Sequence, residues 1–230
     1  RVALNPEQLS ISGCSARSGD AKLQGNVDFK RSQAGVSVSA QLSGNNVTLR
    51  RWAPDLARTN RLSGTADIDI TIAGKALSPR SLSSALDGKG TIRLSNVRVP
   101  GITTQAITAV ARKVIDGALE TEALGPEIKE LVGGGAVDLG GPVLKVRIAN
   151  GTVAFPAIIF DQDAGALRNE TVIDLPRMRI DSQWTVTPEP QPRPDQPGET
   201  VALPPVTVVY AGPIAEIDRI EASVNLGDLE

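Results

Sequence analysis

The chain has 230 residues, and its 24 basic and 26 acidic side chains give a formal net charge of -2. With 40% hydrophobic residues this balance excludes a disordered chain, and without a basic excess we expect no nucleic-acid partner. His is absent and Cys14 is the only cysteine, which removes histidine-based nucleophilic catalysis, histidine-ligated metals and thiolate clusters. We therefore expect no enzymatic activity, no metal and no cofactor.

No segment approaches the ~20 consecutive apolar residues that span a bilayer. The chain begins at Arg1, without Met and without a signal-peptide pattern. We expect a part of a longer protein or a processed chain, whose membrane anchor would lie outside these residues. The whole range 1–230 is expected to form a single β domain.

Alternation of apolar and polar residues is the dominant pattern along the chain. It is clearest in 65–72, where isoleucines alternate with aspartate and threonine, and 36–43 repeats it. Because successive side chains of a strand point to opposite faces, such segments predict antiparallel strands with one apolar and one polar face. The side chains predicted to line the apolar face are Val36, Val38, Leu42, Ile68, Ile70, Ile72, Ile92, Leu94, Leu144, Val146, Ile148, Met178 and Ile180.

Glycines recur beside these alternating runs. Because glycine readily adopts turn geometries, we expect them to separate successive strands in a degenerate series of hairpins. Those that precede a run are Gly25, Gly64 and Gly88, and those that fall at run ends are Gly35, Gly44 and Gly74.

Two segments interrupt the strands with helical signals. Ser78-Pro79 predicts the capped start of a short helix that ends at Gly88. A helical insertion is expected at about 103–132, where apolar residues three and four apart predict an amphipathic helix over about 103–119, followed by a short helix that ends at 133–135. The apolar stripe of the longer helix either packs on the sheet or caps an open groove, and the candidate cap residues are Ile107, Val110, Val114 and Ile115.

Five prolines between Pro188 and Pro197 predict an extended loop at about 188–205. It would join a strand over 177–187 to one over 206–210. Such runs are usually spacers, so we favour a spacer over a docking motif.

Several polar groups could carry chemistry. Asp67 and Asp69 share one strand face at ~7 Å, but with threonine neighbours they indicate a solvated face. The segment 161–165 lacks the ligand spacing of a calcium loop and is better explained as a turn. Arg50-Arg51-Trp52 favours a covered strand end over a lipid-headgroup anchor.

The sequence therefore predicts a mainly β, antiparallel fold with one or two short helices. Two architectures fit the one-faced strands: a strongly curved, elongated sheet that forms a half-pipe groove, or a closed β-sandwich. Aromatic residues make up only 3% of the chain, which favours the half-pipe because compact sandwich cores usually use large rings.

Some motifs resemble a known family. The segments Leu62-Ser63-Gly64-Thr65-Ala66-Asp67-Ile68-Asp69-Ile70 and Leu86-Asp87-Gly88-Lys89-Gly90-Thr91-Ile92, with Gly74 and Ser78-Pro79 between them, resemble the C-terminal region of AsmA-like proteins. Asp174-Leu175-Pro176-Arg177, Val206-Thr207-Val208 and Ala211-Gly212-Pro213-Ile214-Ala215 resemble the closing strands of that family.

This resemblance implies a periplasmic location in a Gram-negative envelope, with an inner-membrane anchor outside the present chain. It also implies a hydrophobic β-groove that carries phospholipid acyl chains toward the outer membrane, and a part in outer-membrane homeostasis. Outer-membrane or envelope proteins are then expected as further partners. The alternative is a non-catalytic scaffold for outer-membrane proteins that adds client strands to its sheet edge by β-augmentation.

Overall fold

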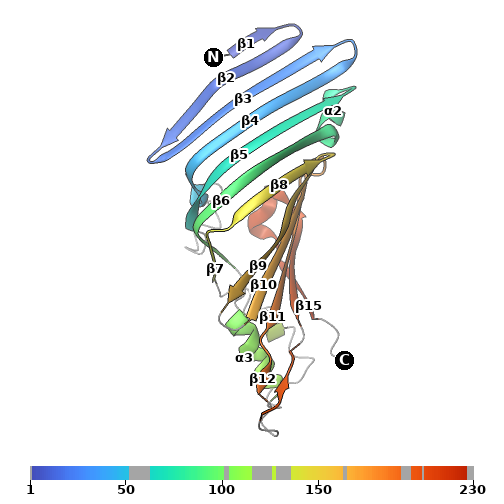
Figure 1. The fold of residues 1–230 in the computed structure, drawn as a ribbon. Coiled ribbons are helices and arrows are strands. Elements are labelled where there is room, and N and C mark those ends of the chain that lie inside the picture. The colour runs from blue at the N-terminus through green and yellow to red at the C-terminus, as the bar shows by residue number, and fades with distance from the viewer. Residues whose placement is uncertain are drawn as a thin grey trace.

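The structure, a computed structural model, describes residues 2–51, 63–100, 104–115, 126–127, 136–162, 165–192, 198–203 and 205–226. One antiparallel sheet of 13 strands dominates these residues. In Figure 1 the strands β1 to β6 lie one below another across the upper part of the molecule, and β9 to β15 run toward the lower end. The sheet does not close into a barrel or sandwich, so the predicted single antiparallel sheet is confirmed.

The strands follow the chain from one edge of the sheet to the other. They are β1 (Val2–Asn5), β2 (Gln8–Ser18), β3 (Ala21–Ser32), β4 (Gly35–Thr48), β5 (Ser63–Ala76), β6 (Leu86–Pro100), β7 (Ala136–Gly140), β8 (Val143–Ala149), β9 (Thr152–Gln162), β10 (Gly165–Asp174), β11 (Arg179–Pro188), β14 (Val206–Pro213) and β15 (Ala222–Leu226). A separate pair is β12 (Gln191–Pro192) and β13 (Thr200–Val201). The helical elements are η1 (Leu49–Arg51), α2 (Pro79–Leu82), η2 (Ser83–Ala85), α3 (Thr104–Ile115) and η4 (Ile214–Arg219).

The long strand β6 has two partners along one edge. Its first half pairs with β8, and its last residues pair with β7. Gly140, with φ of 62°, ends β7 just before β8 begins, so the two behave as one interrupted strand. Beyond β8 the sheet narrows, because β8 and β9 pair only over Arg147–Ala149 and Thr152–Ala154.

The helices form where the sequence predicts them, with different ends. Ser78 caps α2 through a capping box with Ser81, and α3 occupies 104–115 of the predicted 103–119. α2 ends at Leu82, η2 follows, and Gly88 lies inside β6 and does not stop the helix. The second helix predicted before 133–135 lies largely outside the described residues. The proline-rich segment contains the short β12–β13 hairpin, whereas 193–197 lie outside the described residues.

Two buried apolar clusters give the fold its core. The first contains Val146, Ile148 and Val153, at the junction of β8 and β9. The second lies at the C-terminal end, where α3 packs against β10 and β11; its buried members are Ile107, Val110, Val137, Leu167, Val186, Val206 and Val208.

Candidate functional site: the apolar face of the sheet

The strand register places the predicted lining residues, except Met178, on one face of the sheet. Ile68 pairs with Ile92 and Ile92 with Leu144, and directly paired residues point to the same side. The same register adds residues of β2, β3, β9 and β10 that the sequence analysis did not single out. We call this surface the apolar face, and its members are Leu9, Ile11, Leu23, Val27, Phe29, Val36, Val38, Leu42, Ile68, Ile70, Ile72, Ile92, Leu94, Leu144, Val146, Ile148, Val153, Ile173 and Ile180.

Glycines on the apolar face let aliphatic side chains meet across an intervening strand. Gly90 of β6 lies between Ile70 of β5 and Val146 of β8, and a Cβ at Gly90 would come within 2.6 Å of Ile70 Cγ1. Gly44 likewise lies between Leu23 and Ile68, and a Cβ there would be 3.0 Å from Leu23 Cδ2. The glycine positions are therefore covered by neighbouring hydrocarbon, and the apolar surface is continuous across the strands.

This role differs from the sequence prediction that glycines separate the strands. Gly25, Gly44, Gly74 and Gly88 all lie inside strands. Of the glycines considered, Gly35, with φ of 121°, is the one that fits the predicted position at a strand end beside a hairpin turn. The physical reason at Gly44, Gly74 and Gly88 is space, because a Cβ there would come within 3.0 Å of another residue, whereas at Gly25 the nearest atom would be 3.2 Å away.

The most exposed side chains of the apolar face lie on the N-terminal strands. Leu4 in β1 is 78% exposed, and Val27 in β3 and Leu42 in β4 are still 38% and 36% exposed. Ile148 in β8 is 5% exposed, and Val186 in β11 is fully buried. Val36 in β4 and Ile68 in β5 are nevertheless buried, at 3% and 9%, so the N-terminal strands present hydrocarbon to solvent over only part of their apolar face.

The helix α3 accounts for burial at the C-terminal end. Its residues Ile107 and Val110 are 1% and 2% exposed and belong to the cluster that joins Val137 of β7 to Leu167 and Val186. α3 therefore packs on the sheet and closes this end of the apolar face, beside β11 and β12 in Figure 1. The side chains of Val114 and Ile115, the other two candidate cap residues, lie outside what the structure describes.

A polar cluster interrupts the apolar face between the two apolar clusters. Asn169 and Ser182 are each 9% exposed, and Thr171, two residues after Asn169 on β10, pairs with Ser182 on β11. Thr171 Oγ1 donates to Asn169 Oδ1 at 3.2 Å, Ser182 lies 2.8 Å from Thr171, and Asn169 Nδ2 donates to Ser182 at 3.3 Å. Trp184 Nε1 also donates to Ser182 Oγ, at 3.1 Å. The four side chains satisfy one another, which removes most of the cost of burying them.

One predicted lining residue is wrong. Met178 does not point from a strand but lies in the turn between β10 and β11, with φ of 50° and 55% of its surface exposed. The turn is held by Asp174, which accepts hydrogen bonds from Arg177 N at 2.9 Å and Arg177 Nη1 at 2.7 Å. β11 consequently begins at Arg179, and Ile180 is its first residue on the apolar face.

The opposite face, which we call the polar face, carries the charged residues of the strands. Asp67 and Asp69 are exposed there, as expected for a solvated face, and Asp67 accepts a hydrogen bond from Asn46 N at 2.8 Å. Trp52 and 163–164, which the sequence analysis also considered, lie outside the described residues. Among those that are described, no group of acidic or thiol side chains is arranged to hold a metal ion.

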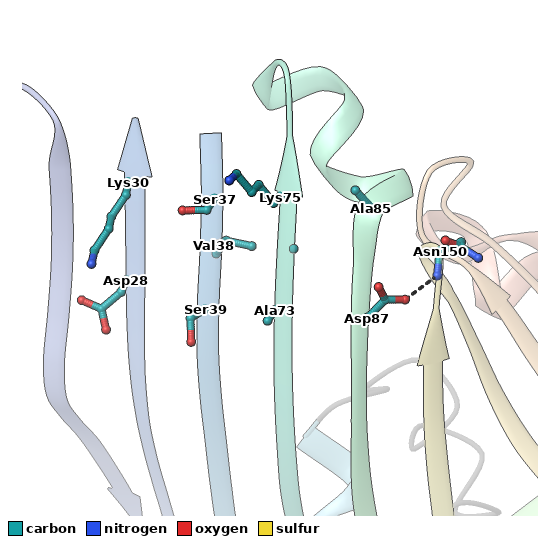
Figure 2. Close-up of a pocket in the computed structure, with 11 residues that line it drawn as sticks. Asp28, Lys30, Ser37, Val38, Ser39, Ala73, Lys75, Ala85, Asp87 and Asn150 are labelled. Atoms are coloured by element: carbon teal, nitrogen blue, oxygen red, sulfur yellow. Dashed lines mark hydrogen bonds between the residues drawn. The ribbon is translucent and has the colours of Figure 1, made fainter. Parts of the chain in front are cut away.

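The polar face is hollowed over β3 to β6, with a volume of about 840 Å³. Figure 2 shows Asp28 and Lys30 on β3, Ser37 and Ser39 on β4, Ala73 and Lys75 on β5, and Asp87 on β6. Sequence patterns do not reveal this hollow, because its lysines are 45 positions apart and only the strand register brings them together.

Two ionisable groups have pKa values that the structure displaces. Burial raises the pKa of Tyr210, which lies beside Ser182 in the register, above its ordinary value of 10.0. Hydrogen bonds from the Arg177 backbone and then from its side chain lower the pKa of Asp174 below its ordinary 3.8.

The helices that the structure describes lack the length and apolar character needed to cross a bilayer. Comparison of the chain with protein-family models, with curated proteins and with solved structures finds no match.

Proposed function

We propose that the apolar face binds the acyl chains of phospholipids, and that the protein is a periplasmic segment of an envelope protein that conducts lipid between the inner and outer membranes. The proposal combines the AsmA-like sequence motifs with one structural observation, the exposed hydrocarbon of β1 to β5. Its membrane anchor would lie outside the present chain. Transfer would need neither a nucleophile nor a cofactor, since it is a partition between environments.

The driving force is removal of hydrocarbon from water. Each methylene that moves from water onto an apolar surface contributes ~0.8 kcal/mol. Val27 and Leu42, more than a third exposed, and Ile70 and Ile72, partly exposed, provide a continuous surface for such contacts. Headgroups would remain in water at the ends of the strands. Nothing in this partition sets a direction, so direction must come from the membranes or from partners.

A second function is favoured by the outer edge of β2. β1 pairs with β2 only from Gln8 to Ile11, so Gly13–Arg17 extend beyond the short edge strand. A client strand from an outer-membrane or envelope protein could pair there by β-augmentation, which would make the protein a scaffold.

Mass spectrometry of lipid that copurifies with the protein distinguishes the two functions. Bound phospholipid in protein extracted without detergent supports lipid conduction, whereas its absence favours the scaffold. The substitution Ile70→Asp places a charge on the apolar face and should abolish lipid transfer between vesicles.

The matched control is Thr71→Asp, because Thr71 is the next residue on β5 and points from the polar face. It adds the same charge at the neighbouring position of the same strand but on the polar face, so it should leave lipid transfer intact. Circular dichroism would show whether each variant is folded. Equal loss of transfer in both folded variants would refute the assignment of acyl chains to the apolar face, and unfolding of Ile70→Asp alone would identify Ile70 as core.

A further inference from the structure

The hollow on the polar face gathers charges of both signs in two rows. Lys30 pairs with Ser37 and Ser37 with Lys75, which places two ammonium groups on either side of one serine. The next row, two residues along the strands, runs from Asp28 through Ser39 and Ala73 to Asp87. The rows are therefore ~7 Å apart, and strands are ~4.8 Å apart within each row.

The floor of the hollow is made of small side chains. Ser37, Ser39 and Ala73 lie between the longer charged residues, which Figure 2 draws as sticks, and this difference in length contributes to the depression. A ligand resting on this floor would reach the lysine row at one end and the aspartate row at the other.

The cationic row is unused within the protein. Among the described residues, Lys30 and Lys75 form no ion pair, and the hydroxyls of Ser37 and Ser39 form no side-chain hydrogen bond. Four hydrogen-bond donors thus face one hollow without an acceptor.

The aspartates are held in place and keep acceptor capacity. Ser10 donates to Asp28 Oδ1, and Asn150 N donates to Asp87 Oδ1 at 3.0 Å, the contact drawn in Figure 2. The second oxygen of each carboxylate takes no hydrogen bond from the described residues. Each aspartate can therefore accept one more donor without losing its present partner.

We propose that this hollow binds a zwitterionic phosphate–ammonium group, with the phosphate on Lys30, Lys75 and the two serines, and the ammonium on Asp28, which lies one strand from Ser39, whereas Asp87 lies two strands from Ser39. An anion alone would be attracted to the lysines and repelled by the aspartates. A cation alone would be attracted to the aspartates and repelled by the lysines. A ligand that carries both charges a few ångströms apart can contact the lysine row with its phosphate and Asp28 with its ammonium. The site lies on the face opposite the apolar face and does not rest on the proposed function.

Such a group occurs in a lipid headgroup, phosphatidylethanolamine, and in a free ester, phosphoethanolamine. The first experiment titrates soluble phosphoethanolamine into the protein by isothermal calorimetry, with inorganic phosphate and ethanolamine as separate probes. We expect phosphoethanolamine to bind more tightly than either probe, and binding to weaken as salt is raised. Failure of phosphoethanolamine to bind at millimolar concentration would overturn the proposal.

The variants K30Q/K75Q and D28N remove the charges assigned to the phosphate and to the ammonium, respectively, and keep side chains of similar size. Each should weaken binding by at least about threefold, which is within the range for exposed ion pairs. The control K89Q/K145Q removes two exposed lysines of the same face that lie outside the hollow, and it should bind like the original protein. An equal loss in K89Q/K145Q would show attraction to net charge alone and would refute the site.

Vesicle flotation then separates the two sources of the group. Binding to vesicles of phosphatidylcholine and phosphatidylethanolamine, abolished by K30Q/K75Q and absent for phosphatidylcholine alone, identifies a lipid headgroup. Calorimetric binding without vesicle binding identifies a soluble ester. Vesicle binding that survives K30Q/K75Q would overturn the assignment of the headgroup to the hollow. The variant Ile70→Asp should leave phosphoethanolamine binding unchanged, so failure of the lipid-transfer proposal would not affect this test.

Discussion

Gly90 provides the sharpest test of how the apolar face is built. In Gly90→Ala the new methyl group would lie 2.6 Å from Ile70 Cγ1 and 2.7 Å from the Asp69 carbonyl oxygen, both well inside van der Waals contact. Overpacking of this kind lowers the free energy of unfolding by about 1–3 kcal/mol. Alanine also reduces the entropy of the unfolded chain, which raises the free energy of unfolding by about 0.4–1 kcal/mol. We therefore expect Gly90→Ala to lower the free energy of unfolding by about 1–2 kcal/mol.

The matched control is Gly25→Ala on β3. There the nearest atoms to the new methyl would be the Gln41 carbonyl oxygen at 3.2 Å and Leu42 Cδ1 at 3.7 Å, so little has to move. Urea unfolding followed by circular dichroism should find Gly25→Ala within about 0.5 kcal/mol of the original protein. Equal stability of the two variants would show that the glycines do not make room for side chains of neighbouring strands.

A double-mutant cycle identifies the atom responsible. Ile70→Ala removes Cγ1, so its cost should be smaller in the Gly90→Ala protein than in the original, with a coupling energy of at least about 0.5 kcal/mol. Additive effects would assign the cost of Gly90→Ala to the Asp69 carbonyl oxygen alone.

Four further outcomes follow from burial and hydrogen bonding, each measured as the free energy of unfolding in urea. Leu167→Ala, at a site 1% exposed, should cost about 2–5 kcal/mol, whereas Leu4→Ala, at a site 78% exposed, should change stability by less than about 0.5 kcal/mol. Ser182→Ala should cost about 1–3 kcal/mol, because it leaves the polar cluster without its shared acceptor. Because the pKa of Tyr210 is raised, its contribution to the free energy of unfolding is complete below about pH 10 and is lost as pH rises through the folded-state pKa. Tyr210→Phe should therefore reduce the loss of stability at alkaline pH. Because the pKa of Asp174 is lowered, its contribution to the free energy of unfolding is present above about pH 4 and is lost as pH falls through the folded-state pKa. Asp174→Asn should remove this loss of stability at acidic pH.

Period-2 alternation was enough to predict the antiparallel sheet and the face to which most apolar residues point. Ile68, Ile70 and Ile72 alternate with polar residues so regularly that one register satisfies them all. Met178 was misplaced because alternation continues through the tight turn that Asp174 holds, and nothing in the pattern marks where β11 begins.

The other features depend on which residues face one another across strands. The in-strand glycines looked like turn residues because glycine is common in turns, and only the register shows that Ile70 and Leu23 need their space. In β10 polar residues occupy both faces, so the alternation that would have revealed the Asn169–Ser182 cluster is missing. The hollow joins Lys30 to Lys75 through Ser37, a pairing that composition and spacing do not contain.

The register also explains why the two ends of the sheet are held differently. β4 and β5 pair along nearly their whole length, whereas β8 and β9 pair over only Arg147–Ala149 and Thr152–Ala154. Backbone hydrogen bonds therefore contribute little across this junction, and side-chain packing must do more. Val146, Ile148 and Val153 are buried there, and α3 contacts both Val137 on β7 and Leu167 on β10. The helix thus joins the two parts of the sheet by the same contacts that close its apolar face, so a change that loosens α3 should expose hydrocarbon and weaken the junction together.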